Sequence, residues 1–478
     1  MSRSRRPAID PRIDPRIDPE GKRLPIKLDS TSNGEFVPVP LSSANRAANR
    51  LAHDVASGFS KRLGFTRRQF LVSACGAAST LLAFNTANAA AGRTGGFFDV
   101  PRAAALDLQL ARVQTGPARD EFIFDVQGHF VDTPRGQKPA TSGNSKGPEV
   151  FIKDVFMDSD TDVMVLSFVP STRADEPVTI EAADAVRSIV DKLEGTHRLL
   201  VHGRVNPNQP GDLETMDELK EKWRVSAWKT YTQYGPRGRG YFLTDDVGTR
   251  FIEKARALGV KTICVHKGLP FGRQSYEHSQ CSDIGVVAKR FPDVNFLVYH
   301  SGFVTSVPEQ PYDESGRRDG VDTLITSLLK NGVKPGGNVY AELGSTWRFL
   351  MRDPEQAAHA LGKLIRFCGE DNVLWGTDSI WYGSPQDQIQ AFRTFQIAPT
   401  LRERFGYAEI TPSLRAKIFG LNAARVYGLS PAEVRKYTAK DSISRQRLAY
   451  REHPEPHFTT YGPKTRREFL SLLRAGKG

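Results

Sequence analysis

The chain has 478 residues, of which 39% are hydrophobic and 25% are charged, as in an ordinary folded protein. Its net charge of +12 lies in the two ends. Residues 1–89 hold 14 basic and 7 acidic residues, a net of +7, and residues 430–478 hold 11 and 5, a net of +6, which leaves −1 for the middle. The middle has no basic stripe interleaved with aromatic residues, so we expect no nucleic-acid partner.

The chain begins with a segment of low complexity. Ile9-Asp10-Pro11-Arg12 recurs as Ile13-Asp14-Pro15-Arg16 and then as Ile17-Asp18-Pro19. Proline at every fourth position blocks a helix, and the charges disfavour a core. We therefore expect a disordered extension over residues 1–60.

Residues 61–90 follow the pattern of an export signal. Thr66-Arg67-Arg68-Gln69-Phe70-Leu71 precedes an apolar stretch from Val72 to Phe84 and then Ala87-Asn88-Ala89. Paired arginines, a modest apolar region and an A-x-A cleavage site resemble a twin-arginine signal. We expect the twin-arginine machinery as a partner and a periplasmic or otherwise exported protein. The alternative is a helix start with two solvated arginines.

The same apolar stretch is shorter than the roughly 20 residues that a membrane-spanning helix needs. We therefore expect no stable membrane anchor. Residues 91–120 are predicted to be a linker between the signal segment and the body of the protein.

Short apolar runs alternate with helical segments from residue 121 to residue 430. The expected strands are Phe122–Val126, Val163–Val169, Arg198–Val201, Ser226–Tyr231, Thr262–Val265, Asn295–Tyr299, Asn338–Ala341 and Val373–Thr377. The expected helices include Ile180–Leu193, Leu213–Trp223, Asp245–Leu258, Ile284–Phe291, Val321–Lys330, Glu355–Cys368 and Pro385–Phe395. This alternation predicts an α/β fold, a (β/α)8 TIM-type barrel. No Gly-rich dinucleotide fingerprint follows the first strand, which disfavours an open Rossmann sheet.

A basic tail follows the barrel over residues 431–478, and we expect it to be helical. It is expected either to wrap the barrel or to contact a neighbouring subunit of a homo-oligomer.

Several expected strands end in side chains that can bind a metal. Gln127 and His129 follow the first strand, His266 the fifth, His300 the sixth and Asp378 the eighth. In a (β/α)8 barrel the C-terminal strand ends converge on one face. Each histidine alone is more often a satisfied polar residue, but their joint placement with a carboxylate favours a divalent metal site.

Four stretches of the sequence resemble the amidohydrolase superfamily. They are Asp125-Val126-Gln127-Gly128-His129, Val298-Tyr299-His300-Ser301-Gly302, Leu374-Trp375-Gly376-Thr377-Asp378-Ser379 and the final Lys417–Tyr427. The closest similarity is to the amidohydrolase-related branch, which includes aminocarboxymuconate semialdehyde decarboxylase. It covers about residues 120–430.

The resemblance implies a barrel with one or two divalent metals and a defined ligand set. It implies that His129, His266 and Asp378 are ligands, and that His300 either acts on the metal-bound water or is itself a ligand. Gln127 stands where family members usually have histidine, and an amide oxygen suits zinc less than harder ions. Zinc is the expected ion, with manganese or iron as alternatives.

The same residues define the expected chemistry. A bound metal would supply activated water near neutral pH, and His300 or Asp378 would accept a proton as the general base. The leading hypothesis is a metal-dependent hydrolase of a small-molecule amide, ester or lactone. The alternative is nonoxidative decarboxylation of an aromatic or unsaturated carboxylic acid. Gln127 keeps open a third hypothesis, a catalytically impaired barrel that binds a small molecule.

Cationic and aromatic residues near the strand ends are candidates for substrate binding. They are Lys229, His202, Arg273 and Trp381. In some family members a lysine near the fourth strand is carboxylated and bridges two metals, so Lys229 is equally a candidate for that role or for a barrel-interior lysine. The alternative for the loops is that the rings seal the barrel mouth and the cations face solvent.

Overall fold

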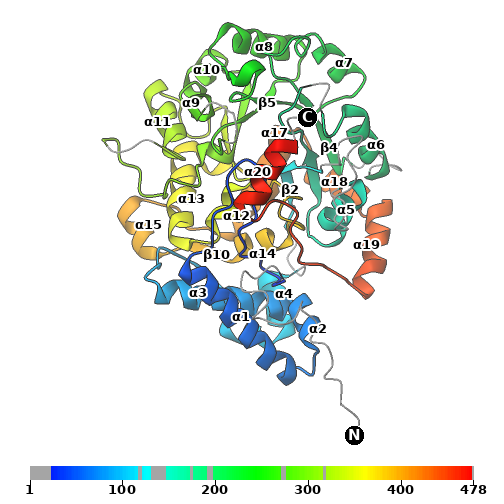
Figure 1. The fold of residues 1–478 in the computed structure, drawn as a ribbon, viewed down its shortest axis with the longest axis vertical. Coiled ribbons are helices and arrows are strands. Elements are labelled where there is room, and N and C mark those ends of the chain that lie inside the picture. The colour runs from blue at the N-terminus through cyan, green and yellow to red at the C-terminus, as the bar shows by residue number, and fades with distance from the viewer. Residues whose placement is uncertain are drawn as a thin grey trace.

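The computed structural model describes residues 23–116, 121–130, 147–172, 176–190, 197–270, 276–315 and 319–475. Its centre is an eight-stranded parallel sheet in which the strands follow one another in chain order (Figure 1). The strands are β2 (Phe124–Gly128), β3 (Val163–Leu166), β4 (Leu199–Arg204), β5 (Ala227–Tyr231), β6 (Thr262–His266), β7 (Asn295–Tyr299), β8 (Val339–Glu342) and β9 (Val373–Leu374). The predicted TIM-type barrel is confirmed.

The sheet closes on itself between its first and last strands. Strand β9 is short, but the chain beyond it continues alongside β2. The Val126 N–H donates to the Trp375 carbonyl at 3.1 Å, and the Asp378 N–H donates to the Gln127 carbonyl at 2.9 Å. These bonds place the residues after β2 and after β9 side by side at the same end of the barrel.

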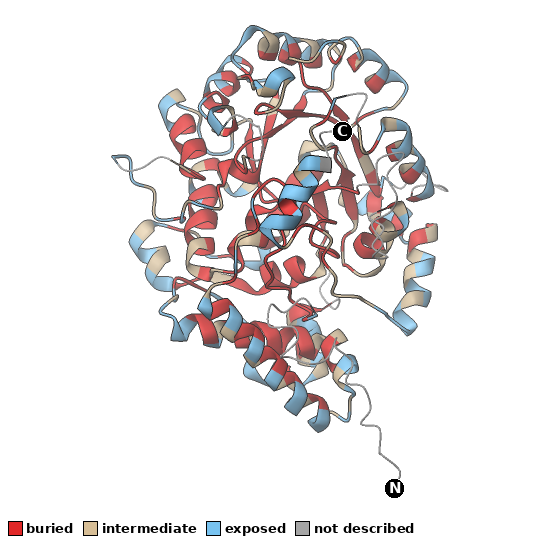
Figure 2. Ribbon diagram, viewed as in Figure 1, coloured by how far each residue is buried: buried red, intermediate tan, exposed pale blue. Residues whose placement is uncertain are grey.

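Helices cover the outside of the barrel and bury their inner faces (Figure 2). The longer ones are α6 (Ile180–Val190), α8 (Asp246–Ala257), α11 (Asp322–Asn331), α13 (Pro354–Cys368) and α14 (Gln386–Thr394). Shorter ones are α5 (Pro148–Ile152), α7 (Met216–Glu221), α9 (Tyr276–Ser279), α10 (Ile284–Arg290), α12 (Thr346–Leu350), α15 (Pro399–Phe405), α16 (Pro412–Ala416) and α17 (Asn422–Val426). Helix α8 shows the cause: Phe251, Ile252 and Ala255 share one buried face, whereas Glu253 between them is exposed.

The N-terminal region differs from the prediction of disorder over residues 1–60. Residues 1–22 lie outside the described chain, but from Arg23 onward the chain is ordered and packed. Leu24, Ile26 and Leu28 are at most 1% exposed, and Lys27 and Asp29 are 2% and 1% exposed. The proline repeat ends at Pro19, and beyond it the segment is buried on both sides, because its apolar side chains pack and its charged ones form buried ion pairs. We call residues 23–42 the strap.

Three helices follow the strap and pack against one another below the barrel. They are α1 (Ser43–Arg62), α2 (Arg67–Val72) and α3 (Ala74–Ala90), so the predicted signal segment is helical. Helix α3 is apolar and largely buried, surrounded by α1, α2 and α4 (Leu108–Thr115). The predicted linker contains α4 and β1 (Gly96–Phe98), which pairs antiparallel with β10 (Phe395–Ile397).

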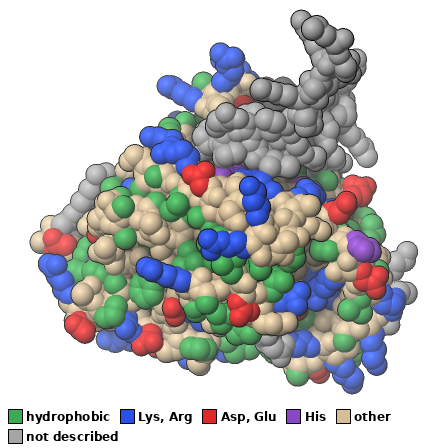
Figure 3. Space-filling view, turned by 90° about the horizontal axis from the view of Figure 1, so that it is seen from below, with side chains coloured by type: hydrophobic (Ala, Val, Ile, Leu, Met, Phe, Trp, Pro, Cys, Tyr) green, Lys and Arg blue, Asp and Glu red, His purple; other side chains and the backbone are tan. Residues whose placement is uncertain are grey.

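Within the described ranges, no helix has both the length and the apolar character needed to cross a membrane. On the face seen from below, Lys and Arg side chains are interspersed with acidic and apolar ones (Figure 3). The basic residues visible there are therefore spread over the surface and do not form a single cluster.

The C-terminal tail wraps the barrel. It contains α18 (Pro431–Thr438), α19 (Ser442–Glu452) and α20 (Arg466–Ala475), and α20 lies across the barrel in Figure 1. Between α19 and α20 the tail bonds to the strap. The Ser32 N–H donates to the Pro463 carbonyl at 2.9 Å, and the Thr31 hydroxyl donates to the Thr460 hydroxyl at 2.8 Å.

A buried ion pair joins the strap to the barrel. Arg348 of α12 donates to Asp29 at 2.7 Å, and the two side chains are 3% and 0% exposed. Burial alone would raise the pKa of Asp29, but the Arg348 charge and hydrogen bonds from Thr31 and Thr460 lower the pKa overall. Asp29 is therefore ionised at neutral pH and connects the strap to both barrel and tail.

We predict that Asp29→Asn lowers the free energy of unfolding by about 3 kcal/mol at pH 7, because it leaves Arg348 buried without a counter-charge. Urea denaturation measures this loss. A carboxyl with a lowered pKa stabilises the fold above its unfolded pKa, and this contribution disappears as the pH falls through the folded pKa. The difference from wild type should therefore shrink in acid. The exposed control Asp217→Asn should keep the wild-type midpoint. A loss below about 1 kcal/mol at pH 7 for Asp29→Asn would contradict the prediction.

Candidate metal centre

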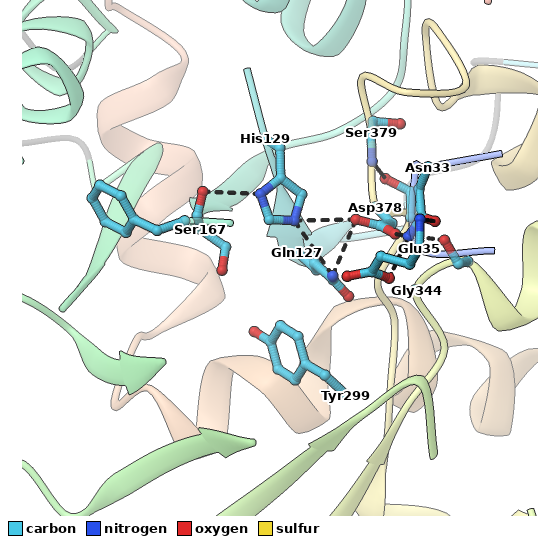
Figure 4. Close-up of polar contacts among 12 residues, drawn as sticks. Asn33, Glu35, Gln127, His129, Ser167, Tyr299, Gly344, Asp378 and Ser379 are labelled. Carbon is cyan, nitrogen blue, oxygen red and sulfur yellow. Dashed lines mark hydrogen bonds and ion pairs between the residues drawn. The ribbon is translucent and has the colours of Figure 1, made fainter. Parts of the chain in front are cut away.

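The C-terminal mouth of the barrel brings His129 and Asp378 together (Figure 4). His129 Nε2 lies 3.1 Å from Asp378 Oδ1. His129 Nδ1 lies 3.0 Å from the Ser167 carbonyl, so this nitrogen carries the proton and Nε2 offers a lone pair when the ring is neutral. Two atoms that both present lone pairs at this distance need a proton or a cation between them. The pair therefore fits a metal site.

His266 and His300 form the opposite side of the cluster. Their ring centroids are 4.5 Å apart, and both side chains are fully buried. His300 Nδ1 donates to the Gly344 carbonyl at 2.6 Å, which leaves Nε2 without a hydrogen-bond partner. Both ring nitrogens of His266 also lack one. Burial lowers the pKa of His300 to about 4 and the pKa of His266 well below its usual value, so both rings are neutral, as metal ligands must be.

The strap places a further carboxylate between these two histidines. Glu35 Oε1 lies 3.4 Å from His266 Nδ1, and Glu35 Oε2 lies 3.6 Å from His300 Nε2. One ligand atom from each of the three residues lies within 4.8 Å of the others. Asn33 joins the two halves of the cluster, because its Nδ2 donates to Glu35 at 2.5 Å and to Asp378 at 2.6 Å. This donor set and its unpartnered nitrogens fit a divalent metal.

The side-chain amide of Gln127 points into the metal-site cluster with its nitrogen, not its oxygen, facing Asp378 and His129. Its Nε2 donates to Asp378 Oδ1 at 3.1 Å and lies 3.4 Å from His129 Nε2, while its Oε1 has no hydrogen-bond partner. A metal-binding amide presents its oxygen. In the arrangement shown, Gln127 therefore acts as a hydrogen-bond donor to Asp378, and coordination would require the amide to turn over.

Asp378 is held as an ionised carboxylate. Its Oδ2 accepts from Asn33 and from Ser345, the latter at 2.5 Å. Burial alone would raise its pKa, but His129, His300 and the Ser345 hydroxyl lower the pKa overall. The backbone of Asp378 has φ +57° and that of His300 φ +64°, a left-handed conformation that is costly outside glycine. Both residues adopt it where the chain leaves the barrel strand.

Two buried carboxyl groups that were not predicted as site residues, Glu342 and Asp125, accept hydrogen bonds from the backbone of the loops that form the site. Glu342 ends β8 and accepts the N–H groups of His300 at 3.0 Å and Gly344 at 2.5 Å. Burial raises its pKa to about 8. Asp125 in β2 accepts the Gln127 N–H at 3.1 Å and the Thr377 N–H at 3.0 Å. Glu342 follows an expected strand and Asp125 lies within one, and this position at the barrel mouth is the sequence feature from which both could have been predicted.

Two of the predicted substrate-binding residues lie inside the barrel. Lys229 Nζ lies 3.6 Å from the centre of the Tyr299 ring and has no hydrogen-bond partner, and burial lowers its pKa to about 8. His202 is engaged through both nitrogens, with the Ser167 hydroxyl and the Tyr427 hydroxyl, each at 3.1 Å. Lys229 therefore has a free ammonium near the site, whereas His202 is part of a hydrogen-bonded barrel interior.

The other two predicted substrate-binding residues are in loops. The Trp381 carbonyl accepts the N–H groups of Tyr461 and Gly462, both at 2.9 Å, and its side chain is 7% exposed. Its backbone thus anchors the C-terminal tail over the mouth. Arg273 lies outside the described residues. Asn33 and Glu35 were missed because the strap was assigned to the disordered extension.

Comparison with known families identifies the class of protein. The family model described as Amidohydrolase matches residues 124–429, which is more than half of the chain. The chain belongs to the amidohydrolase family. The family and the donor set together describe a metal-dependent enzyme. No curated protein matches the chain.

Several solved structures are similar to the barrel. A 5-carboxyvanillate decarboxylase from Sphingomonas paucimobilis has 15% identity and a TM-score of 0.41, covering 65% of this chain and 100% of its own. A zinc-bound amidohydrolase from Burkholderia multivorans has 16% identity and a TM-score of 0.42, covering 65% and 100%. A manganese-bound dihydroxybenzoic acid decarboxylase from a Polaromonas species has 12% identity and a TM-score of 0.37, covering 64% and 97%. At such low similarity these structures do not indicate the reaction of this chain.

We predict that His266→Ala and Asp378→Asn each remove most of the bound metal and keep the fold, because residues at this barrel face serve function more than stability. Elemental analysis after metal-replete expression measures the metal, and circular dichroism checks the fold. The control His453→Ala changes an exposed histidine of the tail and should keep wild-type metal content. Full metal content in either site variant would rule that residue out as a ligand.

Proposed function

We propose that the chain is a metal-dependent hydrolase that uses water to cleave an amide, ester or lactone of a small molecule. The observation that supports this is the ionised Asp378 carboxylate beside His129, linked through Asn33 and Glu35 to the unpartnered nitrogens of His266 and His300. A divalent ion bound there supplies activated water and an electrophile for the carbonyl oxygen. We expect zinc, with manganese or iron as alternatives.

Each residue has a distinct proposed role. His129 and His266 bind the ion through their lone pairs. Asp378 accepts a proton from the attacking water and passes it to the leaving group as general base and then acid. His300, fixed by its bond to Gly344, presents Nε2 either as a further ligand or as a second proton acceptor. Hydrogen bonds from Asn33 and Ser345 orient the Asp378 carboxylate.

The closed mouth favours a small substrate. His129 is 3% exposed, Asp378 is 1% exposed and Glu35 is 9% exposed, and the strap and the tail lie over the mouth. A polymer or a protein could not reach these atoms without displacing both segments. Exclusion of bulk water also strengthens the electrostatic interactions at the reacting atoms.

Nonoxidative decarboxylation is the second candidate, and Lys229 is the observation that favours it. A buried ammonium without a hydrogen-bond partner is costly unless a negative charge joins it. A substrate carboxylate would provide that charge. In this reaction His300 or Asp378 would deliver the proton that replaces carbon dioxide on the substrate carbon.

We predict that protein stripped by a chelator and reloaded with zinc or manganese hydrolyses members of a panel of lactones, esters and amides. In ¹⁸O-labelled water the new carboxyl group should contain the label. Asp378→Asn should lower kcat by about 100-fold or more, because it removes a proposed metal ligand together with the general base, which alone contributes about that much. Carbon dioxide release from aromatic or unsaturated acids, without hydrolysis, would identify the decarboxylase. Metal-loaded protein that binds panel members without turnover would be the catalytically impaired barrel.

We also propose that the chain is exported to the periplasm through the twin-arginine route, with the export machinery binding Arg67 and Arg68. The motif supports this, and Arg68 is exposed at the start of α2. We predict that Arg67→Lys combined with Arg68→Lys reduces the exported fraction, measured by cell fractionation. An unchanged distribution would contradict the proposal, and Arg67 would then serve only to join α2 to α1 through its hydrogen bonds to His53 and Ser57.

A further inference from the structure

The strap is fixed to the barrel on the N-terminal side of Glu35. Lys27 Nζ donates to the Ser384 carbonyl at 2.9 Å and pairs with Asp387 at 3.4 Å, and both side chains are at most 3% exposed. Two residues after Lys27, Asp29 forms an ion pair with Arg348 of α12. Buried ion pairs of this kind require defined geometry, so the path of the strap into the mouth is specified.

The tail covers the strap at the turn that contains Glu35. Gly34 has φ +88°, and a side-chain Cβ placed there would lie 2.9 Å from Leu472 of α20. Glycine suits this position because it has no Cβ: it adopts the left-handed backbone conformation without strain and leaves room for α20. The strap is held between the barrel and the tail.

The turn itself orients the Glu35 carboxylate. The Asn33 side-chain oxygen accepts the Glu35 N–H at 3.0 Å, and the Ser32 hydroxyl accepts the Gly34 N–H at 3.0 Å. The other end of the Asn33 amide donates to Glu35 and Asp378. One asparagine thus sets the distance between the strap carboxylate and the barrel carboxylate.

We propose that Glu35 is a metal ligand, supplied by the strap in place of the donor that Gln127 does not provide. This inference rests on the proposed metal-dependent function. Glu35 lies between His266 and His300 at 3.4 and 3.6 Å, and these contacts involve nitrogens that have no hydrogen-bond partner. Gln127 turns its amide nitrogen toward the cluster. A carboxylate oxygen is a suitable ligand for zinc and for manganese.

The number of buried carboxyl groups in the cluster also supports a bound cation. Glu35 and Asp378 are two carboxyls linked through Asn33, and Glu342 is a third nearby. Carboxylates that share a buried site repel one another unless one takes up a proton or a cation lies among them, and burial together with Asp378 and Glu342 raises the pKa of Glu35 well above its usual value. A divalent ion held by Glu35 and Asp378 would balance their two charges, whereas neutral histidines do not.

The proposed ligand Glu35 lies N-terminal to the predicted cleavage site at Ala87-Asn88-Ala89. Cleavage after Ala89 would remove Glu35 together with α1, α2 and α3. It would also remove Leu24, Ile26 and Leu28, which are buried against the rest of the protein. The metal-loaded enzyme therefore retains the strap, which means that export through the twin-arginine route would have to leave the Ala87-Asn88-Ala89 site uncleaved, and the measured mass should include residues 23–89.

The test uses the full chain, stripped of metal and titrated with zinc in competition with a coloured chelator. Glu35→Gln should weaken zinc binding by about 10-fold or more and change the visible absorption spectrum of the cobalt(II)-loaded protein, because an anionic donor is lost. Glu35→Asp keeps the donor on a shorter side chain and should recover part of the affinity. The matched control Glu253→Gln, exposed on α8, should behave as wild type. Thermal unfolding of each metal-free variant reports whether it is folded.

The variants and the wild-type chain separate the ligand assignment of Glu35 from the proposed metal-dependent function. Wild-type affinity and an unchanged cobalt spectrum in Glu35→Gln, with metal loss in His266→Ala, would overturn the ligand assignment and leave the proposed function standing. Unchanged affinity with faster turnover in Glu35→Gln would make the strap an inhibitor instead. A wild-type chain that binds neither zinc, manganese nor cobalt would overturn both proposals.

Discussion

Pairing between β2 and the chain that follows β9 is the constraint on which both the barrel and the site depend. The His129 N–H donates to the Ser379 carbonyl at 2.5 Å, and the Ile380 N–H donates to the His129 carbonyl at 3.0 Å. These backbone bonds close the barrel. They also bring the His129 ring and the Asp378 carboxylate from opposite ends of a stretch of about 250 residues into contact, which is the reason why parallel barrels place their chemistry at this face.

The interior of the mouth combines neutral nitrogens with negative oxygens. His266 and His300 are neutral because burial lowers their pKa, whereas Asp378 stays ionised despite its burial because His129, His300 and the Ser345 hydroxyl lower its pKa. Such a set has more lone pairs than protons. A divalent cation satisfies this imbalance. The hydrogen bonds that His129 donates to the Ser167 carbonyl and His300 donates to the Gly344 carbonyl fix which ring nitrogen faces the cation.

The barrel could be predicted from sequence because its strands and helices have regular apolar periods. The strand expected over Thr262–Val265 ends one residue later, and the helix expected over Ile284–Phe291 ends one residue earlier. Four candidate metal ligands could be predicted because the C-terminal ends of barrel strands converge on one face. They are His129, His266, His300 and Asp378. Glu35 could not be found in this way, because its position depends on the Asp29–Arg348 ion pair and on the tail. The local signal was the set of apolar residues Leu24, Ile26 and Leu28 that follows the end of the proline repeat. Helix α3 is apolar on all sides, a pattern shared by export signals and by buried helices.

A crystal structure of the full chain grown with zinc or manganese, with anomalous diffraction recorded at the metal edge, would show whether the barrel mouth binds the ion. We predict an anomalous peak at the mouth within about 2.0–2.5 Å of donor atoms from His129, His266 and Asp378. Absence of a peak at the mouth in crystals that contain the metal elsewhere, or a peak that these side chains do not reach, would contradict it.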